Sequence, residues 1–235
     1  MAPTIDTVLQ DEELILRWLP GTARRLVVVF TGVRAGFGGA PLDEFARSAS
    51  RRGENNVLFV TDRRGSWYCA PGLWSRIARL VKYLHKSEGI EEIVTLGNSM
   101  GGYGALLLPQ YLRVRRAIAF SPQLTLDRGL VADVRWPDVV KRFGRMHPRN
   151  LGDTVAATRT HYYLTAGGGC REDVDHLALA PSIDRVNRWV LQGGRHNLAG
   201  ELRNAGILYD VVGALIRGRK ARVDTLYAAF QGDAA

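Results

Sequence analysis

One stretch constrains the fold more than any other, because it joins a buried strand to a helix through a glycine-flanked serine. The residues at 93–96 are apolar or β-branched, and Gly97-Asn98-Ser99-Met100-Gly101 follows them and fits the pattern G-x-S-x-G. Small residues and then leucines come next, which is typical of a helix. The order strand, tight turn and helix predicts that Ser99 is a nucleophile whose hydroxyl stands at a helix N-terminus, near N–H groups that stabilise an oxyanion. An incidental serine in a glycine-rich turn is the alternative.

The remaining apolar runs alternate with helical patterns, which predicts an α/β fold with a mostly parallel sheet and helices on both faces. Continuous apolar runs are typical of strands that are buried on both faces. The first strands, at residues 7–19, alternate loosely and predict an antiparallel hairpin at a sheet edge. Further strands are expected at 26–30, 56–61, 117–120, 161–165 and 186–191, and helices at 71–86 and 198–217.

Residues 124–159 are the least regular segment, and we expect them to form a short cap-like insert within a single domain that covers residues 1–235. The segment mixes Trp136 and Phe143 with basic residues, a combination that is able to bind an anionic group. A partly helical connection with a solvated basic face is the alternative. Its basic residues are Arg128, Arg135, Lys141, Arg142, Arg145 and Arg149.

Three candidate groups follow three of the expected strands. Ser99 follows one strand, an acidic stretch follows the next-to-last, and His196 follows the last. In parallel sheets the carboxyl ends of the strands meet at one edge, where sites form. For the acid we favour Asp173, because it should lie in a loop. Asp175 is the first alternative, expected near the N-terminus of the following helix, and Glu172 also competes.

The chain resembles the α/β-hydrolases, in particular small serine esterases and lipases. The resemblance rests on the edge hairpin and on residues 27–32, 97–102, 120–122 and 194–196, and it extends over nearly the whole sequence. It implies a three-layer fold with roughly eight strands, and a triad in which His196 is the base and the acid orients it. It also implies that the backbone N–H groups of Met100 and Val33 form the oxyanion hole.

Three functions are compatible with these residues. The first is hydrolysis of a carboxylic ester, or a related acyl bond, through an acyl-enzyme. The second is acyl transfer by the same triad, and the third is a non-catalytic protein that binds an anionic partner through its basic surface. The expected substrate is a small-molecule or glycan-linked acyl compound, anionic compounds included, and no cofactor is expected.

Net charge, cysteine count and the spacing of possible metal ligands limit the kinds of partner that we expect. The formal net charge is +9, with 32 lysines and arginines, which favours anionic partners or a solvated basic surface. The basic run at 217–222 is short, so nucleic acid is not expected.

Cys69 and Cys170 make neither a disulfide framework nor a zinc site with four ligands. His176 with Asp173 and Asp175 is an incomplete ligand set, so no metal is expected.

The chain is also expected to lie in the cytoplasm. No apolar run reaches the roughly 18 residues that a membrane span needs. The first residues, 1–6, lack the basic and apolar regions of a secretory signal.

Overall fold

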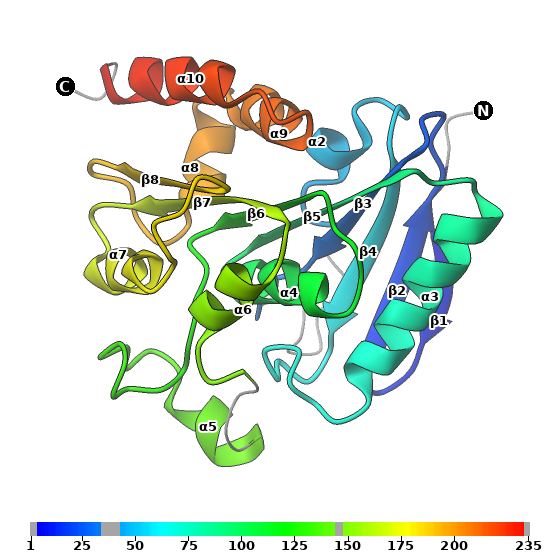
Figure 1. Ribbon diagram of the computed structural model, residues 1–235, viewed down its shortest axis with the longest axis horizontal. Helices are drawn as coiled ribbons and strands as arrows, with labels where there is room; N and C mark the ends of the chain where they lie inside the picture. Colours follow the sequence, from blue (N-terminus) through cyan, green and yellow to red (C-terminus); the bar gives the residue numbers. More distant parts are fainter. Residues whose placement is uncertain (1–3, 34–42, 144–147, 233–235) are drawn as a thin grey trace.

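The computed structural model describes residues 4–33, 43–143 and 148–232, and its centre is a twisted sheet (Figure 1). The sheet has eight strands in the order β1-β2-β4-β3-β5-β6-β7-β8. Strand β2 pairs antiparallel with both β1 and β4, and all other pairs are parallel. The strands are β1 (Asp6–Gln10), β2 (Leu14–Leu19), β3 (Arg25–Phe30), β4 (Asn56–Asp62), β5 (Glu92–Asn98), β6 (Arg116–Phe120), β7 (His161–Gly167) and β8 (Val186–Leu191). The predicted fold class, with its antiparallel hairpin at the edge, is confirmed.

The sequence of strand β3 is continuously apolar because both of its faces are buried. Side chains alternate between the two faces of a sheet, so Leu26, Val28 and Phe30 enter one core while Val27 and Val29 enter the other. All five are fully buried. At about 25 cal/mol per Å² of apolar area, burial of each such side chain contributes on the order of 2 kcal/mol. A strand that is buried on both faces therefore needs no polar position.

Two helical layers cover the sheet, one on each face (Figure 1). Each layer shares a hydrophobic cluster with the strand side chains on its side. The first layer contains α3 (Leu73–Ser87), α4 (Met100–Leu107), α6 (Leu151–Ala157) and α7 (Arg171–Ala178). The second contains α2 (Ala46–Ser50), α8 (Leu198–Asn204), α9 (Leu208–Ile216) and α10 (Lys220–Gly232). Among the described residues, no helix is long and apolar enough to cross a membrane.

The helix predicted at 198–217 is wrong as a single element. The structure has two helices there, α8 and α9, because the chain turns at Gly206, whose φ is +76°. Glycine adopts this left-handed conformation without the steric cost that a side chain would add. The break lets Leu202 and Val211 pack into the same core from two different directions.

The segment 124–159 divides into two parts. Its second half forms α6, whose Leu151 and Val155 are fully buried in the first helical layer, next to α4. Its first half is irregular up to α5 (Pro137–Phe143), which lies away from both layers in Figure 1. This irregular half is the part that carries Arg135 to the carboxyl ends of the strands.

Candidate active site

Ser99 stands in a sharp turn between β5 and α4, with φ 54° and ψ −122°. A non-glycine residue in such a conformation costs on the order of 1–3 kcal/mol, and the tightly packed neighbours hold it there. A Cβ atom on Gly101 would lie 2.1 Å from the carbonyl oxygen of Phe30, so the turn requires glycine at this position. Ser99 itself is only 7% exposed. The turn thus places one hydroxyl at the start of α4 and at the end of a central strand.

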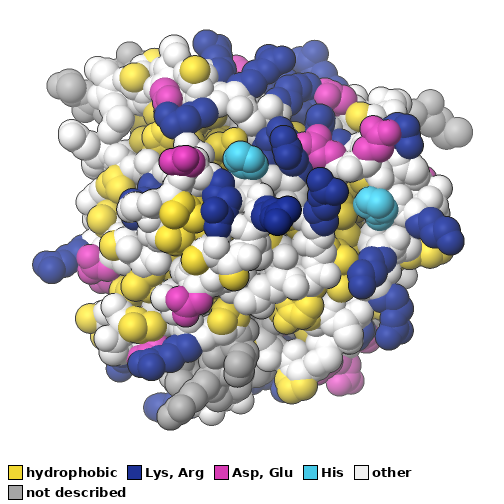
Figure 2. All heavy atoms as spheres, viewed as in Figure 1, with side chains coloured by type: hydrophobic (Ala, Val, Ile, Leu, Met, Phe, Trp, Pro, Cys, Tyr) yellow, Lys and Arg dark blue, Asp and Glu magenta, His cyan; other side chains and the backbone are white. Residues whose placement is uncertain are grey.

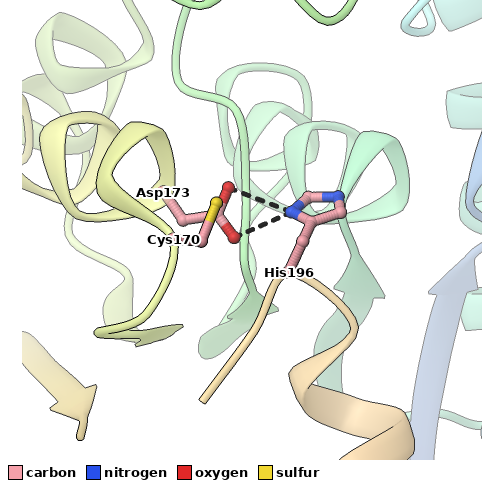
Figure 3. Close-up of side chains that lie close together, drawn as sticks. All are labelled: Cys170, Asp173 and His196. Carbon is pink, nitrogen blue, oxygen red and sulfur yellow. Dashed lines mark hydrogen bonds and ion pairs between the residues drawn. The ribbon is translucent and has the colours of Figure 1, made fainter. Parts of the chain in front are cut away.

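His196 lies in the turn between β8 and α8 and contacts both other predicted triad residues. Its Nε2 is 3.0 Å from the Ser99 Oγ. Its Nδ1 is 2.7 Å from the Asp173 Oδ2 (Figure 3). Because a carboxylate only accepts, Nδ1–H donates to Asp173, which leaves the Nε2 lone pair to accept from the serine hydroxyl. This is the tautomer that a general base needs.

Asp173 is fully buried, and its surroundings favour the ionised form. Burial opposes the charge, but hydrogen bonds and the charges of His196 and Arg135 together hold the pKa of Asp173 below its ordinary value. Its predicted position in a loop is wrong, because α7 begins at Arg171 and Asp173 lies in the first turn of that helix. The loop that leads into α7 is joined to the turn that carries His196 by a hydrogen bond of 2.8 Å from Gly169 N to Gly194 O.

The competing acids point elsewhere. Asp175 has a half-exposed side chain and forms an ion pair with Arg171 at 3.7 Å. Glu172 accepts a hydrogen bond of 3.4 Å from the Cys170 thiol. Of the three predicted candidates, only Asp173 contacts His196 in the structure.

The two predicted oxyanion donors follow neighbouring strands, Met100 after β5 and Val33 after β3. Met100 is the first residue of α4, and the first N–H groups of a helix have no acceptor within the helix. Val33 follows strand β3, which pairs with β5 so that Phe30 is opposite Gly97. Just before Val33, the Gly32 N–H donates to the Glu44 Oε1 at 3.1 Å, which anchors this loop. The donor roles themselves remain predictions.

Four polar residues near the triad were not expected there from the sequence. The first is Gln123, which follows β6; its buried Oε1 is 3.3 Å from the Ser99 Oγ and offers the hydroxyl a second acceptor. The others are Arg135, Asp133 and His176. Arg135 donates to Asp173 at 2.9 Å, and His176 Nε2 is 3.2 Å from the Asp133 Oδ2. Arg135 was predicted only as one basic residue of the segment 124–159, and His176 only as part of an incomplete metal-ligand set.

Cys170, Asp173 and His196 form a cluster whose candidate ligand atoms lie within 4.8 Å of one another (Figure 3). A guanidinium already contacts this cluster: the Arg135 Nη1 lies 3.4 Å from the Cys170 Sγ and 3.2 Å from the His196 Nδ1. Burial also raises the pKa of Cys170 to about 11, so the thiol stays protonated. These side chains therefore suit a cation supplied by the protein itself better than a metal ion.

The alternative ligand set of His176, Asp173 and Asp175 does not come together. His176 is fully buried and faces Asp133, whereas Asp175 is exposed on the outside of α7. The three residues share a helix but not a face. The ligand set that the sequence left incomplete is therefore not assembled by the fold.

A hollow of about 1040 Å³ lies at the other end of the sheet, at the amino ends of β5, β6 and β7. It is lined by Arg113, Arg115 and Arg159 together with Glu91 and Glu92. Lys and Arg side chains also gather around two histidines on the face drawn in Figure 2. The hollow is separate from the triad, which lies at the carboxyl ends of the strands.

No protein-family model and no curated protein sequence matches this chain. Among solved structures, the capsule O-acetyltransferase of Neisseria meningitidis serogroup A is similar, with a TM-score of 0.64 and 15% identity over 89% of this chain and 93% of that one. An esterase from Pyrococcus furiosus has a TM-score of 0.61 and 18% identity over 92% and 91% of the two chains. An arylesterase has a TM-score of 0.65 and 19% identity over 92% and 84%. The chain therefore has the α/β-hydrolase fold.

Proposed function

We propose that the chain is a serine hydrolase that cleaves a carboxylic ester through Ser99, His196 and Asp173. One observation carries the proposal: a continuous line of contacts runs from the buried Asp173 carboxylate through His196 to the Ser99 hydroxyl, at 2.7 and 3.0 Å. A serine hydroxyl is a weak nucleophile, and it needs a base within hydrogen-bond reach. The order of the three residues along the chain is also that of the α/β-hydrolase triad.

The acylation step uses each group once. Ser99 Oγ attacks the ester carbonyl carbon while its proton passes to His196 Nε2, and Asp173 stabilises the imidazolium. The N–H groups of Met100 and Val33 donate to the oxygen on which negative charge develops; losing one such donor typically costs about 3 kcal/mol in the transition state. The C–O bond then breaks, and the alcohol leaves with the proton from His196.

Water completes the cycle by the same route. It attacks the acyl-enzyme carbonyl, gives a proton to His196, and releases the acid as Ser99 recovers its proton. The nucleophile, base and acid are all side chains of this chain, so the proposed reaction requires no cofactor. The proposed substrate is a small-molecule or glycan-linked acyl ester.

Hydrolysis of p-nitrophenyl esters tests the proposal. Acetate, butyrate and octanoate esters should be cleaved by the wild-type protein above the buffer rate. Ser99→Ala and His196→Ala should each lower kcat by on the order of 10³ or more, while the melting temperature stays within a few degrees of the wild type. Cleavage that survives Ser99→Ala would contradict the serine mechanism.

Acyl transfer is the second candidate, and the fold similarity to a capsule O-acetyltransferase favours it. Both reactions form the same acyl-enzyme and differ only in whether water or another alcohol attacks it. Adding glycerol or an oligosaccharide to the ester assay separates them. A transferase would form acylated acceptor faster than free acid at millimolar acceptor, whereas a hydrolase would release mainly the acid.

A further inference from the structure

Arg135 reaches from the irregular segment into the space beside the triad and contacts two acids at once. Its Nη2 donates to the Asp173 Oδ1 at 2.9 Å and to the Asp133 Oδ2 at 2.6 Å. Its Nε donates to the Asp133 Oδ1 at 2.9 Å, so the Asp133 contact is bidentate. A bidentate Arg–carboxylate pair is geometrically specific as well as strong, so the guanidinium is held in one orientation.

Asp133 is in turn held from its other side. His176 is fully buried, its Nε2 is 3.2 Å from the Asp133 Oδ2, and its Nδ1 is buried without a hydrogen-bond partner among the described residues. A neutral imidazole with its proton on Nε2 fits these surroundings, because a second N–H would be left without an acceptor. Burial opposes the Asp133 charge, but hydrogen bonds from His176 and Arg135 hold the pKa of Asp133 far below its ordinary value.

The charges of Asp173, Arg135 and Asp133 sum to a single negative charge. Asp173 and Asp133 each carry a negative charge and Arg135 a positive one, so the group carries the same single negative charge that a triad acid alone would supply. The Arg135 Nη1 is only 3.2 Å from the His196 Nδ1, which already directs its proton to Asp173. The guanidinium therefore opposes formation of the imidazolium, and Asp133 offsets that effect.

We propose that Arg135 is a positioning residue of the triad, held by Asp133 and His176, that shares the Asp173 carboxylate with His196 and tunes how strongly the imidazolium is stabilised. The proposal rests on the proposed serine mechanism and adds to it three residues that support the triad: Arg135, Asp133 and His176. Arg135 touches no reacting atom; it acts through Asp173 and the orientation of His196. It also fixes the irregular segment to α7 at the site.

Other polar and titratable groups near His196 come from the start of α7 and from the serine turn. At the start of α7, the Cys170 thiol and the Glu172 carboxylate face each other at 3.4 Å. From the serine turn before α4, the uncharged Ser99 hydroxyl contacts the imidazole. Asp175 and Arg171 pair with each other on the outside of α7. Arg135 is thus the one positively charged side chain recorded in contact with the imidazole among the described residues.

The test is the pH profile of kcat/KM on a p-nitrophenyl ester. Arg135→Gln removes the positive charge, so the imidazolium is favoured and the acidic limb should move to higher pH by about one unit. Asp133→Asn leaves the guanidinium uncompensated, so the limb should move to lower pH. The double variant Asp133→Asn/Arg135→Gln restores the single negative charge, and its limb should return toward the wild-type position.

Arg149→Gln is the matched control, because Arg149 belongs to the same basic segment but its side chain is 70% exposed and pairs with Asp127. Its pH profile should equal that of the wild type. Arg135→Ala should lose at least tenfold in kcat at the optimum, with partial recovery on addition of guanidinium ions at millimolar concentration. A purely structural role would give neither recovery nor limbs that move in opposite directions.

Two failures remain distinguishable. If wild-type turnover does not depend on Ser99, the serine mechanism itself is wrong. If turnover depends on Ser99 but the limbs of Arg135→Gln and Asp133→Asn coincide with the wild type, Arg135 does not tune the triad. Should one single variant fail to fold, as judged by circular dichroism, the other still has a predicted direction of its own: higher pH for Arg135→Gln and lower pH for Asp133→Asn. A limb that stays at the wild-type position in the folded single variant would overturn the proposal.

Discussion

A Cβ atom on Gly97 would lie 2.1 Å from the carbonyl oxygen of Gly101, a distance that no relaxed structure tolerates. Strand β5 and helix α4 therefore meet backbone to backbone at the serine turn. Gly97→Ala must push the strand and the helix apart, which should destabilise the protein by at least roughly 1–3 kcal/mol. It should also lower the rate of ester hydrolysis, because Ser99 would shift. Urea unfolding followed by tryptophan fluorescence measures the loss.

Gly232→Ala provides the control for this substitution. Gly232 lies in α10, and a Cβ atom there would meet nothing within 4 Å. Alanine is the better helix former, so the variant should be as stable as the wild type or up to about 1 kcal/mol more stable. Equal destabilisation by both substitutions would mean that the close contact at Gly97 is not the cause.

Asp173 and Asp175 give a second prediction, because only two positions separate them on α7. Asp173→Asn keeps the side-chain shape but removes the negative charge that holds the His196 proton on Nδ1. It should therefore lower kcat by on the order of 10³ to 10⁴. Asp175→Asn should change kcat less than twofold, since it breaks only an exposed ion pair with Arg171. Loss of activity in the second variant alone would assign the triad acid to Asp175.

Glu44 makes stability depend on pH in an unusual direction. Burial raises its pKa from 4.5 to about 7, while the hydrogen bond from the Gly32 N–H acts in the opposite sense. Between pH 4.5 and pH 7 the folded protein keeps this proton and the unfolded chain has lost it. The contribution of Glu44 to stability is therefore fully present below pH 4.5 and is lost as the pH rises through 7.

The measurement is the free energy of unfolding of Glu44→Gln against the wild type at pH 5 and pH 8. The glutamine side chain cannot ionise, so the free energy of unfolding of the variant should rise relative to that of the wild type as the pH rises. The change should be roughly 3 kcal/mol at most, since one pKa unit corresponds to about 1.4 kcal/mol. A difference that stays constant between the two pH values would show that Glu44 titrates normally.

Much of this architecture could be predicted because local patterns determine it. The continuous apolar run at 26–30 favours a strand that is buried on both faces, and the glycine-flanked Ser99 favours a tight turn after such a strand. Once a parallel sheet is accepted, the carboxyl ends of its strands bring Ser99 and His196 to the same edge. That reasoning needs no knowledge of how any loop runs.

The parts that escaped prediction depend on loop paths. The start of α7 at Arg171 moved Asp173 from a loop into a helix, although its contact with His196 is the one expected of a triad acid. Arg135 looked like one more basic residue of an irregular segment. Its contact with Asp173 spans 38 positions and depends on how residues 124–136 run, which no periodicity fixes.

The most direct test of the central claim is covalent labelling of the wild-type protein with a fluorophosphonate, followed by peptide mass spectrometry. The phosphonyl group should be found on Ser99 alone, at close to one group per chain. Labelling should be absent in Ser99→Ala, strongly slowed in His196→Ala, and unchanged in Asp175→Asn. An adduct on another residue, or none on the folded wild-type protein, would contradict the assignment of Ser99 as the nucleophile.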